Sequence, residues 1–248
     1  MTRPTQLNRG LFGAWCPSLG NTGLRLYDRT VRKNHGTLTN MTAATAWVKI
    51  GGKGALELDG IDDSIAASLI TPATTQLTLS CWARLRSTGG QGTGFSRLFA
   101  RSNTSQFALS YTNAGLAVAI NGTTNTFAHT ASSTTFQHLV ATWDGATVRV
   151  FVNGTQIGSA AYSGTLAAST IPINLGGISG LQRTIDGFAD DWRVSLSSLT
   201  APEIRQLYVG GRGFGLLPER PRRRGTAAAA GFKAFRARRQ SQLIGGGL

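Results

Sequence analysis

The feature that most constrains this chain is a short alternating segment with a turn dipeptide at each end. Residues 148–153 read VRVFVN, with valine at every second position; Asp-Gly stands at 144–145 and Asn-Gly at 153–154. A period of two predicts a strand with two unlike faces. Asn-Gly favours a tight hairpin because both central residues need a positive φ. The region therefore predicts antiparallel strands joined by short turns.

The end of the same region predicts a last strand and one helix. Asp186-Gly187 is interpreted as a turn that leads into a strand over residues 188–194. Thr200-Ala-Pro-Glu203 matches a capping box and predicts a short helix through Leu207. Further short alternating segments recur along the chain, punctuated by Gly or Asn, and this favours a sandwich over a parallel α/β sheet. We expect an all-β fold with two antiparallel sheets and one short helix.

Several motifs occur in a fixed order along the chain. They are Leu58-Asp-Gly-Ile-Asp-Asp63, Thr78-Leu-Ser-Cys-Trp82, Trp143-Asp-Gly145 with Val152-Asn-Gly154, and Asp190-Asp-Trp-Arg193 with Leu199-Thr-Ala-Pro-Glu-Ile204. In this order they resemble the LamG-like, concanavalin A-like jelly rolls, over residues 10–208. The resemblance implies an antiparallel two-sheet jelly-roll sandwich whose first and last strands lie near each other. It also implies that Trp15, Trp82 and Trp143 pack in the core.

The net charge of +14 is divided unevenly along the chain. Residues 1–33 carry six Arg or Lys and one acid, residues 212–248 carry nine and one, and the stretch between them is close to neutral. This division predicts basic arms that reach an acidic partner surface, and not a broad nucleic-acid-binding face on the body. We expect no membrane span, because no run of about eighteen apolar residues exists. The N-terminus also lacks the apolar region of a secretory signal.

Composition divides the chain into four expected segments. They are an extended basic arm over residues 1–9, the sandwich over 10–208, a Gly/Pro/Arg-rich linker over 209–226 that starts with a flexible Gly-rich connector, and a basic anchoring segment over 227–248. The residues expected to dock on a partner are Arg222, Arg223, Arg224, Phe232, Phe235, Arg236, Arg238 and Arg239. The terminal run Ala237-Arg-Arg-Gln-Ser-Gln-Leu-Ile-Gly-Gly-Gly247 also resembles the C-termini of LamG-like proteins encoded in phage and prophage structural regions. The expected partner is a protein assembly such as a viral capsid, in a homo-oligomeric or multi-subunit setting.

No catalytic motif stands out. Hydrolysis of a glycosidic bond needs two carboxylates about 5 Å or about 6.5–9.5 Å apart. Asp186 and Asp190 would lie roughly 13 Å apart on a regular strand, and Asp191 would face the other side. The three histidines have no metal-ligand spacing, and no Cys-x-x-Cys, His-Glu-x-x-His, Gly-x-Ser-x-Gly or Walker sequence occurs. We expect no enzymatic activity.

Calcium is the cofactor that the resemblance raises, because in some family members the loop matching residues 20–36 helps to bind it. In this chain Asp28 is surrounded there by cationic side chains, which repel a metal ion. We therefore expect no cofactor, with calcium as a disfavoured alternative. The two cysteines, Cys16 and Cys81, cannot form a disulfide framework. Cys81 is interpreted as a buried core residue, and a bond between the two is left open.

Together these patterns predict a non-enzymatic structural or surface component of a large assembly, a phage capsid decoration or attachment protein located in the virion. Its loops are expected to expose a rim that contacts glycans, with candidate residues Gln91, Asn121, Asn125 and Trp192. A free carbohydrate-binding lectin, cytoplasmic or extracellular, is the main alternative. Contact of the basic arms with nucleic acid is a second alternative, because arginine pairs well with phosphates.

Overall fold

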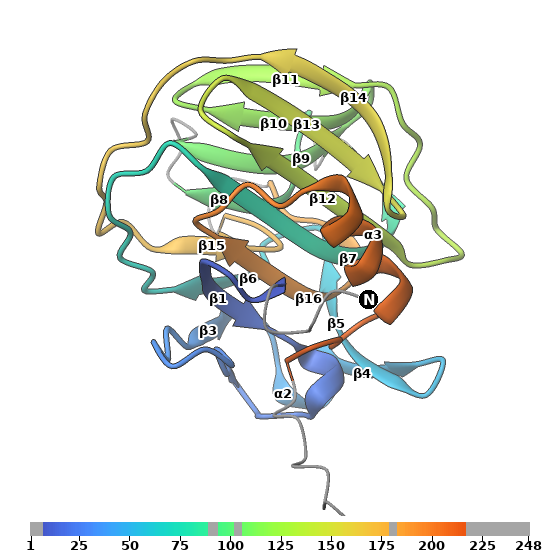
Figure 1. The fold of residues 1–248 in the computed structure, drawn as a ribbon. Coiled ribbons are helices and arrows are strands. Elements are labelled where there is room, and N and C mark those ends of the chain that lie inside the picture. Colours follow the sequence, from blue (N-terminus) through green and yellow to red (C-terminus); the bar gives the residue numbers. More distant parts are fainter. Residues whose placement is uncertain (1–6, 89–93, 102–105, 179–182, 217–248) are drawn as a thin grey trace, which may run out of the picture. The chain divides into compact units, whose positions relative to one another are not determined.

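A computed structural model describes residues 7–88, 94–101, 106–178 and 183–216. These residues form a sandwich of two eight-stranded sheets, and adjacent strands pair antiparallel throughout (Figure 1). The strands of the first sheet are β1 (Leu11–Trp15), β4 (Trp47–Ile50), β5 (Lys53–Asp59), β7 (Leu77–Ser87), β12 (Gln137–Trp143), β13 (Thr147–Val152), β14 (Thr155–Ala161) and β16 (Asp186–Ser195). Those of the second are β2 (Arg25–Leu26), β3 (Gly36–Thr39), β6 (Ser64–Ala67), β8 (Ser96–Arg101), β9 (Phe107–Thr112), β10 (Gly115–Ile120), β11 (Thr123–Phe127) and β15 (Ile173–Leu175). The predicted all-β jelly-roll sandwich is confirmed.

The strand order explains how the chain ends come together. The first sheet runs β14-β13-β12-β7-β16-β5-β4, with β1 paired to β16, and the second runs β11-β10-β9-β8-β15-β6-β3-β2. The β1–β16 pairing places the first strand of the chain beside the last, as the family resemblance implied. The hairpin of β12 and β13 is also confirmed, and Asn153 and Gly154 turn into β14 with φ of 51° and 77°. Positive φ at both positions is what the Asn-Gly dipeptide predicts.

The central strand β7 shows why this sequence builds a two-faced sheet. Leu77, Leu79 and Cys81 face the other sheet and belong to the main hydrophobic core. Trp15 and Trp143 lie in the same core, and their burial confirms the prediction made for them. Cys16 and Cys81 are both buried and free, so no disulfide joins them. Burial of these alternate positions in a dry core is the main source of the sandwich's stability.

The outer face of the first sheet is covered by α3 (Ala201–Gly210). Its predicted capping box, formed by Thr200 and Glu203, is confirmed, and the helix continues past Leu207. A second hydrophobic cluster lies there; its buried members are Leu7, Val140, Phe151, Leu199, Ile204 and Leu207, and Phe214 packs against them. Trp82 is buried on this side and stacks on Tyr208 of the helix at 5.8 Å between ring centroids. The helix therefore keeps the outward-facing apolar positions of the sheet out of water.

Two expectations about the ends of the sandwich are wrong. Leu7 is only 3% exposed, Asn8 donates to the Gly215 carbonyl and the Arg9 carbonyl accepts from the Ser195 hydroxyl, so residues 7–9 are held against the sandwich and are not part of an extended arm. The glycine-rich residues 211–215 are not a loose connector either. Their backbone is held because Gly213 N donates to the Asp191 carboxylate and the Phe214 carbonyl accepts from Arg193. The predicted docking residues between 222 and 239 lie outside the described residues.

The strand β16 differs from the regular strand expected there. Asp186 and Gly187 belong to the strand and do not form a turn before it. A bulge shifts the pairing register between Asp190 and Arg193, and Asp191 has a φ of 52°. Asp190 and Asp191 are buried, and Asp191 forms a bidentate ion pair with Arg193 at 2.8 Å. The bulge brings both acids into a buried ionic network.

Several short elements carried no clear sequence signal. Examples are β2, β3, β4 and β11, together with η1 (Pro17–Leu19) and α2 (Ala43–Ala46). Because β2 and β3 flank the loop that contains Arg29 and Lys33, the cations of this loop belong to the sandwich. The expectation that these charges form part of a basic arm is wrong. No helix within the described residues is long and apolar enough to span a membrane.

Candidate functional site

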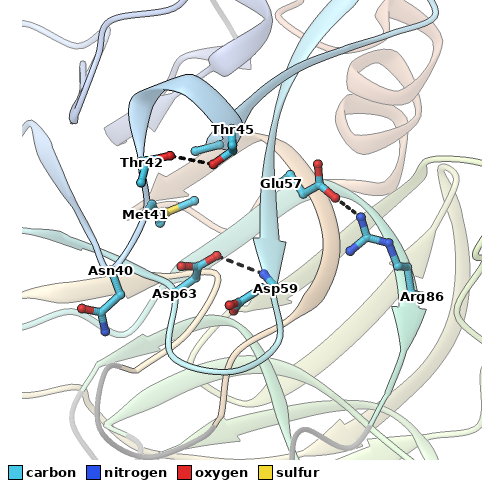
Figure 2. A pocket seen from close by; sticks show the side chains of 9 residues that line it. Asn40, Met41, Thr42, Thr45, Glu57, Asp59, Asp63 and Arg86 are labelled. Carbon is cyan, nitrogen blue, oxygen red and sulfur yellow. Dashed lines mark hydrogen bonds and ion pairs between the residues drawn. The ribbon is translucent and has the colours of Figure 1, made fainter.

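A polar pocket of about 450 Å³ opens at the edge of the sandwich, where loops from both sheets meet (Figure 2). Its lining residues are Asn40, Met41, Thr42, Thr45, Ala46, Glu57, Asp59, Asp63 and Arg86. They come from the β3–α2 connection, from α2, from the end of β5, from the turn before β6 and from β7. Its volume lies within the roughly 300–1,000 Å³ range of small-ligand pockets. We take this pocket as the candidate functional site.

One wall of the pocket is built by the start of α2. Asn40 has a φ of 62°, which turns the chain sharply out of β3, and its side-chain amide donates to the Asp62 carbonyl at 3.2 Å. Asparagine tolerates this conformation better than most residues. Thr42 and Thr45 lie one helical turn apart, with their hydroxyls 2.7 Å from each other. Met41, 8% exposed, supplies an apolar surface beneath these polar groups.

The opposite wall is organised by Arg86. Its guanidinium pairs with Glu57 of β5 and, at 2.9 Å, with Asp186 of β16. It also lies over the Phe188 ring, with its Cζ 4.5 Å from the ring centroid. These contacts fix the planar guanidinium in one orientation, although its side chain is 41% exposed. The pocket therefore presents one oriented cation among several acids.

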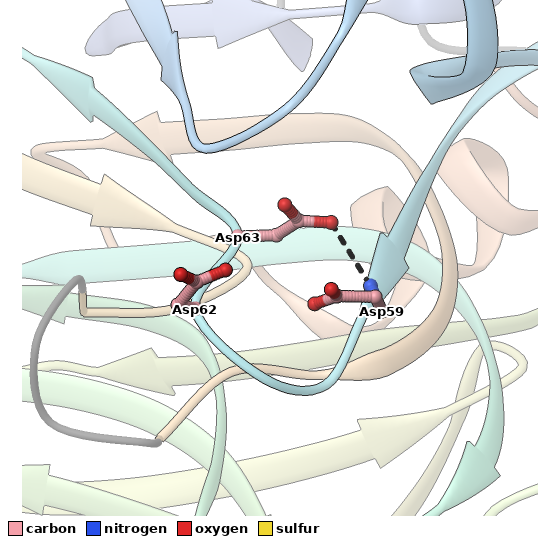
Figure 3. Close-up of side chains that lie close together, drawn as sticks. All are labelled: Asp59, Asp62 and Asp63. Atoms are coloured by element: carbon pink, nitrogen blue, oxygen red, sulfur yellow. Dashed lines mark hydrogen bonds between the residues drawn. The ribbon is translucent and has the colours of Figure 1, made fainter.

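The acids come from the turn Asp59–Asp63, which joins β5 to β6 (Figure 3). Asp63 accepts a hydrogen bond from the Asp59 backbone at 3.0 Å, and the Asp59 carboxylate accepts from Ile61 N at 2.8 Å. Gly60 permits the turn, because its φ is 79° and a Cβ there would lie 2.7 Å from the Asp186 Cβ. Burial, together with the charges of Asp59 and Asp62, raises the pKa of Asp63 to about 6. This turn concentrates negative charge in a strongly cationic chain.

The same turn is where a cation would fit. Carboxylate oxygens of Asp59, Asp62 and Asp63 all lie within 4.8 Å of one another. Oxygen ligands of this kind suit Ca²⁺ or Mg²⁺. Either ion would complete its coordination with further oxygens or water. The loop in which calcium was considered from the sequence lacks this capacity, because the Asp28 carboxylate is filled by protein donors. Those donors are Ala14 N, Thr30 N, the Thr30 hydroxyl and Asn34 N, at 2.8–2.9 Å.

The predicted glycan rim is not brought together at this pocket. The prediction that Trp192 is a rim residue is wrong. Trp192 is fully buried, and its indole N–H donates to the Leu98 carbonyl of the opposite sheet at 3.1 Å. Asn121 is exposed in the turn between β10 and β11, where it donates to the Thr165 carbonyl. Asn125 is half-buried on β11, and Gln91 lies outside the described residues. Neither described asparagine lines the pocket.

The acids considered for hydrolysis do not form a catalytic pair. Asp190 and Asp191 are enclosed in the buried network of β16, where Asp190 accepts from Ser18 N at 3.0 Å. Asp186 is engaged by Arg86 and Ser87. Sequence reasoning missed the pocket residues themselves, although Asp59, Asp62 and Asp63 were quoted as a family motif. That Asp-Gly-Ile-Asp-Asp run was the signal that could have located the site.

The fold and the pocket define a jelly-roll sandwich protein with a polar surface pocket at the edge of its sheets. The chain belongs to the concanavalin A-like lectin/glucanases superfamily, whose family model matches residues 59–205. The match covers more than half of the chain and includes the acidic turn and Arg86. No curated protein sequence matches the chain.

Solved structures with low sequence identity share the fold. The binding domain of Paraclostridial Mosquitocidal Protein 1 is 15% identical, with a TM-score of 0.65, over 82% of this chain and 52% of that one. Domain 4 of AbnA, an extracellular arabinanase from Geobacillus stearothermophilus solved with arabinotriose, is 16% identical, with a TM-score of 0.61, over 79% and 97%. The receptor-binding domain of botulinum neurotoxin type G is 14% identical, with a TM-score of 0.59, over 81% and 51%. This chain thus spans about half of the two toxin domains and nearly all of the arabinanase domain.

Proposed function

We propose that this protein is a non-catalytic glycan-binding module and that its ligand occupies the pocket lined by Asn40, Asp59, Asp63 and Arg86. The observation that carries the proposal is the convergence of carboxylates, an amide, hydroxyls and a guanidinium on one hollow with a small apolar wall. Carboxylates accept hydrogen bonds from sugar hydroxyls, amides both accept and donate them, and charge-assisted hydrogen bonds are the stronger kind. A methionine beside them suits the C–H face of a sugar ring.

The comparisons support the same class of ligand. The arabinanase domain was solved with arabinotriose, and the chain covers nearly all of that domain. Fold likeness alone assigns no ligand, so the proposal depends on the chemistry of the pocket. The acidic lining favours a neutral or amine-bearing sugar over an anionic one, because a carboxylated or sulfated sugar would be repelled by the acids of the turn.

We also propose that the pocket does not hydrolyse its ligand. Glycoside hydrolysis needs one carboxyl group free to donate a proton and a second one free to attack or to activate water. Glu57, across the pocket from Asp63, has its carboxylate engaged by Arg86. Asp63 is tied to the Asp59 backbone. This arrangement favours binding without bond cleavage.

A titration of the full-length protein with neutral oligosaccharides, arabinotriose included, tests the proposal by calorimetry with and without calcium. We expect saturable binding that Asp59→Asn weakens at least tenfold. The matched control is Asn125→Ala, which alters the separate rim position and is expected to bind normally. An unchanged affinity in Asp59→Asn would move the ligand away from the pocket. Release of new reducing ends during the titration would assign catalysis instead.

A role in a large assembly is the second candidate function, and a specific observation favours it. Residues 217–248 carry eight Arg or Lys and a single acid, and they follow the last packed segment of the sandwich. We propose that this segment anchors the protein in a virion, as a capsid decoration or attachment protein, while the pocket faces outward. Deleting residues 217–248 is expected to abolish incorporation into particles and to leave sugar binding intact. Normal incorporation would refute the anchoring role, and salt-dependent DNA binding lost in the same deletion would indicate nucleic acid as the partner.

A further inference from the structure

A second surface with a different chemistry lies in residues 21–33, which include β2 and most of its connection to β3 and which we call the cationic loop. Its exposed cations are Arg25, Arg29, Arg32 and Lys33. Seven large hydrophobic side chains are exposed in the described part of the chain, and three of them, Leu24, Tyr27 and Val31, belong to this loop. Val31 is 95% exposed, which is unusual for an aliphatic residue in a folded segment. The loop thus combines clustered positive charge with clustered apolar surface.

The loop is held firmly from inside the sandwich. Its one acid, Asp28, is 4% exposed and accepts four hydrogen bonds from the surrounding chain, so it leaves no negative charge at the surface. His35 Nδ1 accepts from Asp28 N at 3.0 Å. The indole N–H groups of Trp15 and Trp47 donate to the carbonyls of Asn34 and Gly23, both at 2.8 Å. These contacts and the buried Leu26 and Asp28 side chains fix the backbone, while the cations and Leu24, Tyr27 and Val31 stay exposed.

Two of the cations are also oriented by aromatic rings. The Arg32 guanidinium lies over Phe12, with Cζ 3.8 Å from the ring centroid, and that of Arg25 lies 5.8 Å from the centroid of Tyr27. Cation–π contacts of this kind reduce the freedom of long side chains before any partner binds. Val31 stands between Arg29 and Arg32 in the chain, so the apolar tip is flanked by positive charge.

We propose that the cationic loop binds the surface of a bilayer that carries anionic phospholipid headgroups, with Val31 entering the interface. Basic side chains near such a surface contribute affinity by pairing with headgroup phosphates, and apolar side chains between them bury area in the acyl boundary. Such a surface would engage both the cations and the exposed apolar side chains of the loop. A soluble polyanion such as nucleic acid would use the cations but leave Val31 and Leu24 in water.

The loop and the sugar pocket are separate sites. β2 runs antiparallel beside β3, with Leu26 opposite Gly36, so the tip of the loop around Val31 lies beyond the start of β3. Asn40 and Thr42 of the pocket follow the other end of that strand. The pocket is acidic and would be repelled by an anionic headgroup layer. Lipid binding by the loop therefore does not depend on the proposed sugar binding, and either proposal can fail alone.

A fluorophore placed at the loop tip tests the proposal in the full-length protein. Cys16 and Cys81 are buried, and burial raises the pKa of both thiols, so an NBD dye is expected to label Val31→Cys selectively. The control is Val209→Cys on α3, where the native side chain is 73% exposed. Vesicles containing phosphatidylglycerol are expected to shift NBD emission at position 31 to the blue. Position 209, and vesicles of phosphatidylcholine alone, should give no shift.

Charge variants separate the loop from the basic tail, which also attracts anionic vesicles. Arg29→Gln with Lys33→Gln is expected to lower vesicle affinity about 25-fold, about fivefold per cation. Arg149→Gln on β13 with Arg205→Gln on α3 removes the same charge elsewhere and should change affinity less than threefold. The proposal would be overturned if the protein bound vesicles without an NBD shift at position 31, or if both charge pairs lowered vesicle affinity equally. It would also be overturned if dextran sulfate gave the same NBD shift.

Discussion

The cationic loop and the turn Asp59–Asp63 each contain a buried aspartate, but the two carboxylates differ in how many hydrogen-bond donors surround them. In the cationic loop, each oxygen of Asp28 accepts two hydrogen bonds, three of the four donors being backbone N–H groups. In the turn Asp59–Asp63, Asp63 accepts one backbone hydrogen bond. Its carboxylate oxygen lies within 4.8 Å of carboxylate oxygens of Asp59 and Asp62. The Asp28 carboxylate is fully used in holding the surrounding chain, whereas Asp59 and Asp63 each accept one backbone hydrogen bond and also line a pocket.

The difference separates a structural acid from a candidate functional one better than residue type or exposure does. Asp28 and Asp63 are buried to a similar degree, at 4% and 7% exposed. Their donor counts differ fourfold, and only Asp63 has like charges beside it. A carboxylate that is buried with few donors and near other carboxylates costs stability, so a folded protein tends to keep such a group where function needs it.

The largest expected effect concerns the structural acid. In Asp28→Asn, one oxygen becomes an amide nitrogen that cannot accept hydrogen bonds, so two buried donors lose their partner. We expect the free energy of unfolding to fall by about 3 kcal/mol, because a hydrogen bond to a charged group contributes about 1.5–3 kcal/mol. Urea denaturation followed by tryptophan fluorescence measures the loss. Asp62→Asn, the same change at an exposed acid, is the control and should stay within about 0.5 kcal/mol.

The intermediate effect concerns Asp63 and has a defined pH dependence. Its pKa is raised in the folded protein to about 6, so the folded state holds the proton more tightly than the unfolded chain. The stability contribution of this group therefore falls as pH rises from about 4 to 6. Asp63→Asn cannot ionise and still offers an oxygen to Asp59 N. We expect it to match the wild type at pH 4 and to exceed it by about 1 kcal/mol at pH 7.

Thermal unfolding of both proteins across this pH range checks the prediction. Asp190 also has a pKa raised to about 6 by burial, but it titrates in both proteins and cancels in the difference. A variant less stable than the wild type at pH 7 would mean that the Asp63 charge is stabilising, and the contrast with Asp28 would then disappear.

The fold was largely predictable because its signals are local. The Asn-Gly hairpin, the alternation in β13 and the capping box of α3 each depend on neighbours in the chain. The bulge in β16 was not predictable in this way, because the Asp191 residue that adopts the positive φ is held by Gly213, which is far from it in the sequence. For the same reason Trp192 was misplaced. A tryptophan on a terminal strand gives no sign that its indole N–H reaches the opposite sheet.

The site was predictable only in part. The Asp-Gly-Ile-Asp-Asp motif lies on one turn and could have been recognised as a carboxylate cluster from spacing alone. Asn40, Glu57 and Arg86 come from separate elements and meet only after the sheets have formed. The charge distribution misled for a related reason, since counting along the chain assigned Arg29 and Lys33 to an arm when β2 and β3 fix their loop to the sandwich.

The smallest effect on stability, and the sharpest test of what the open acids bind, comes from Arg86→Gln. The ion pairs of Arg86 are partly exposed, so their loss should change the free energy of unfolding by less than about 1 kcal/mol. The variant frees Glu57 and Asp186 and makes the pocket more acidic. A sugar ligand loses one charge-assisted hydrogen bond and should bind about tenfold more weakly. A divalent cation held by the turn would bind more tightly, so calorimetry with calcium and with the oligosaccharide gives shifts of opposite sign. If both affinities stayed unchanged, neither ligand would occupy the space between Arg86 and the acidic turn, and the open carboxylates would need another explanation.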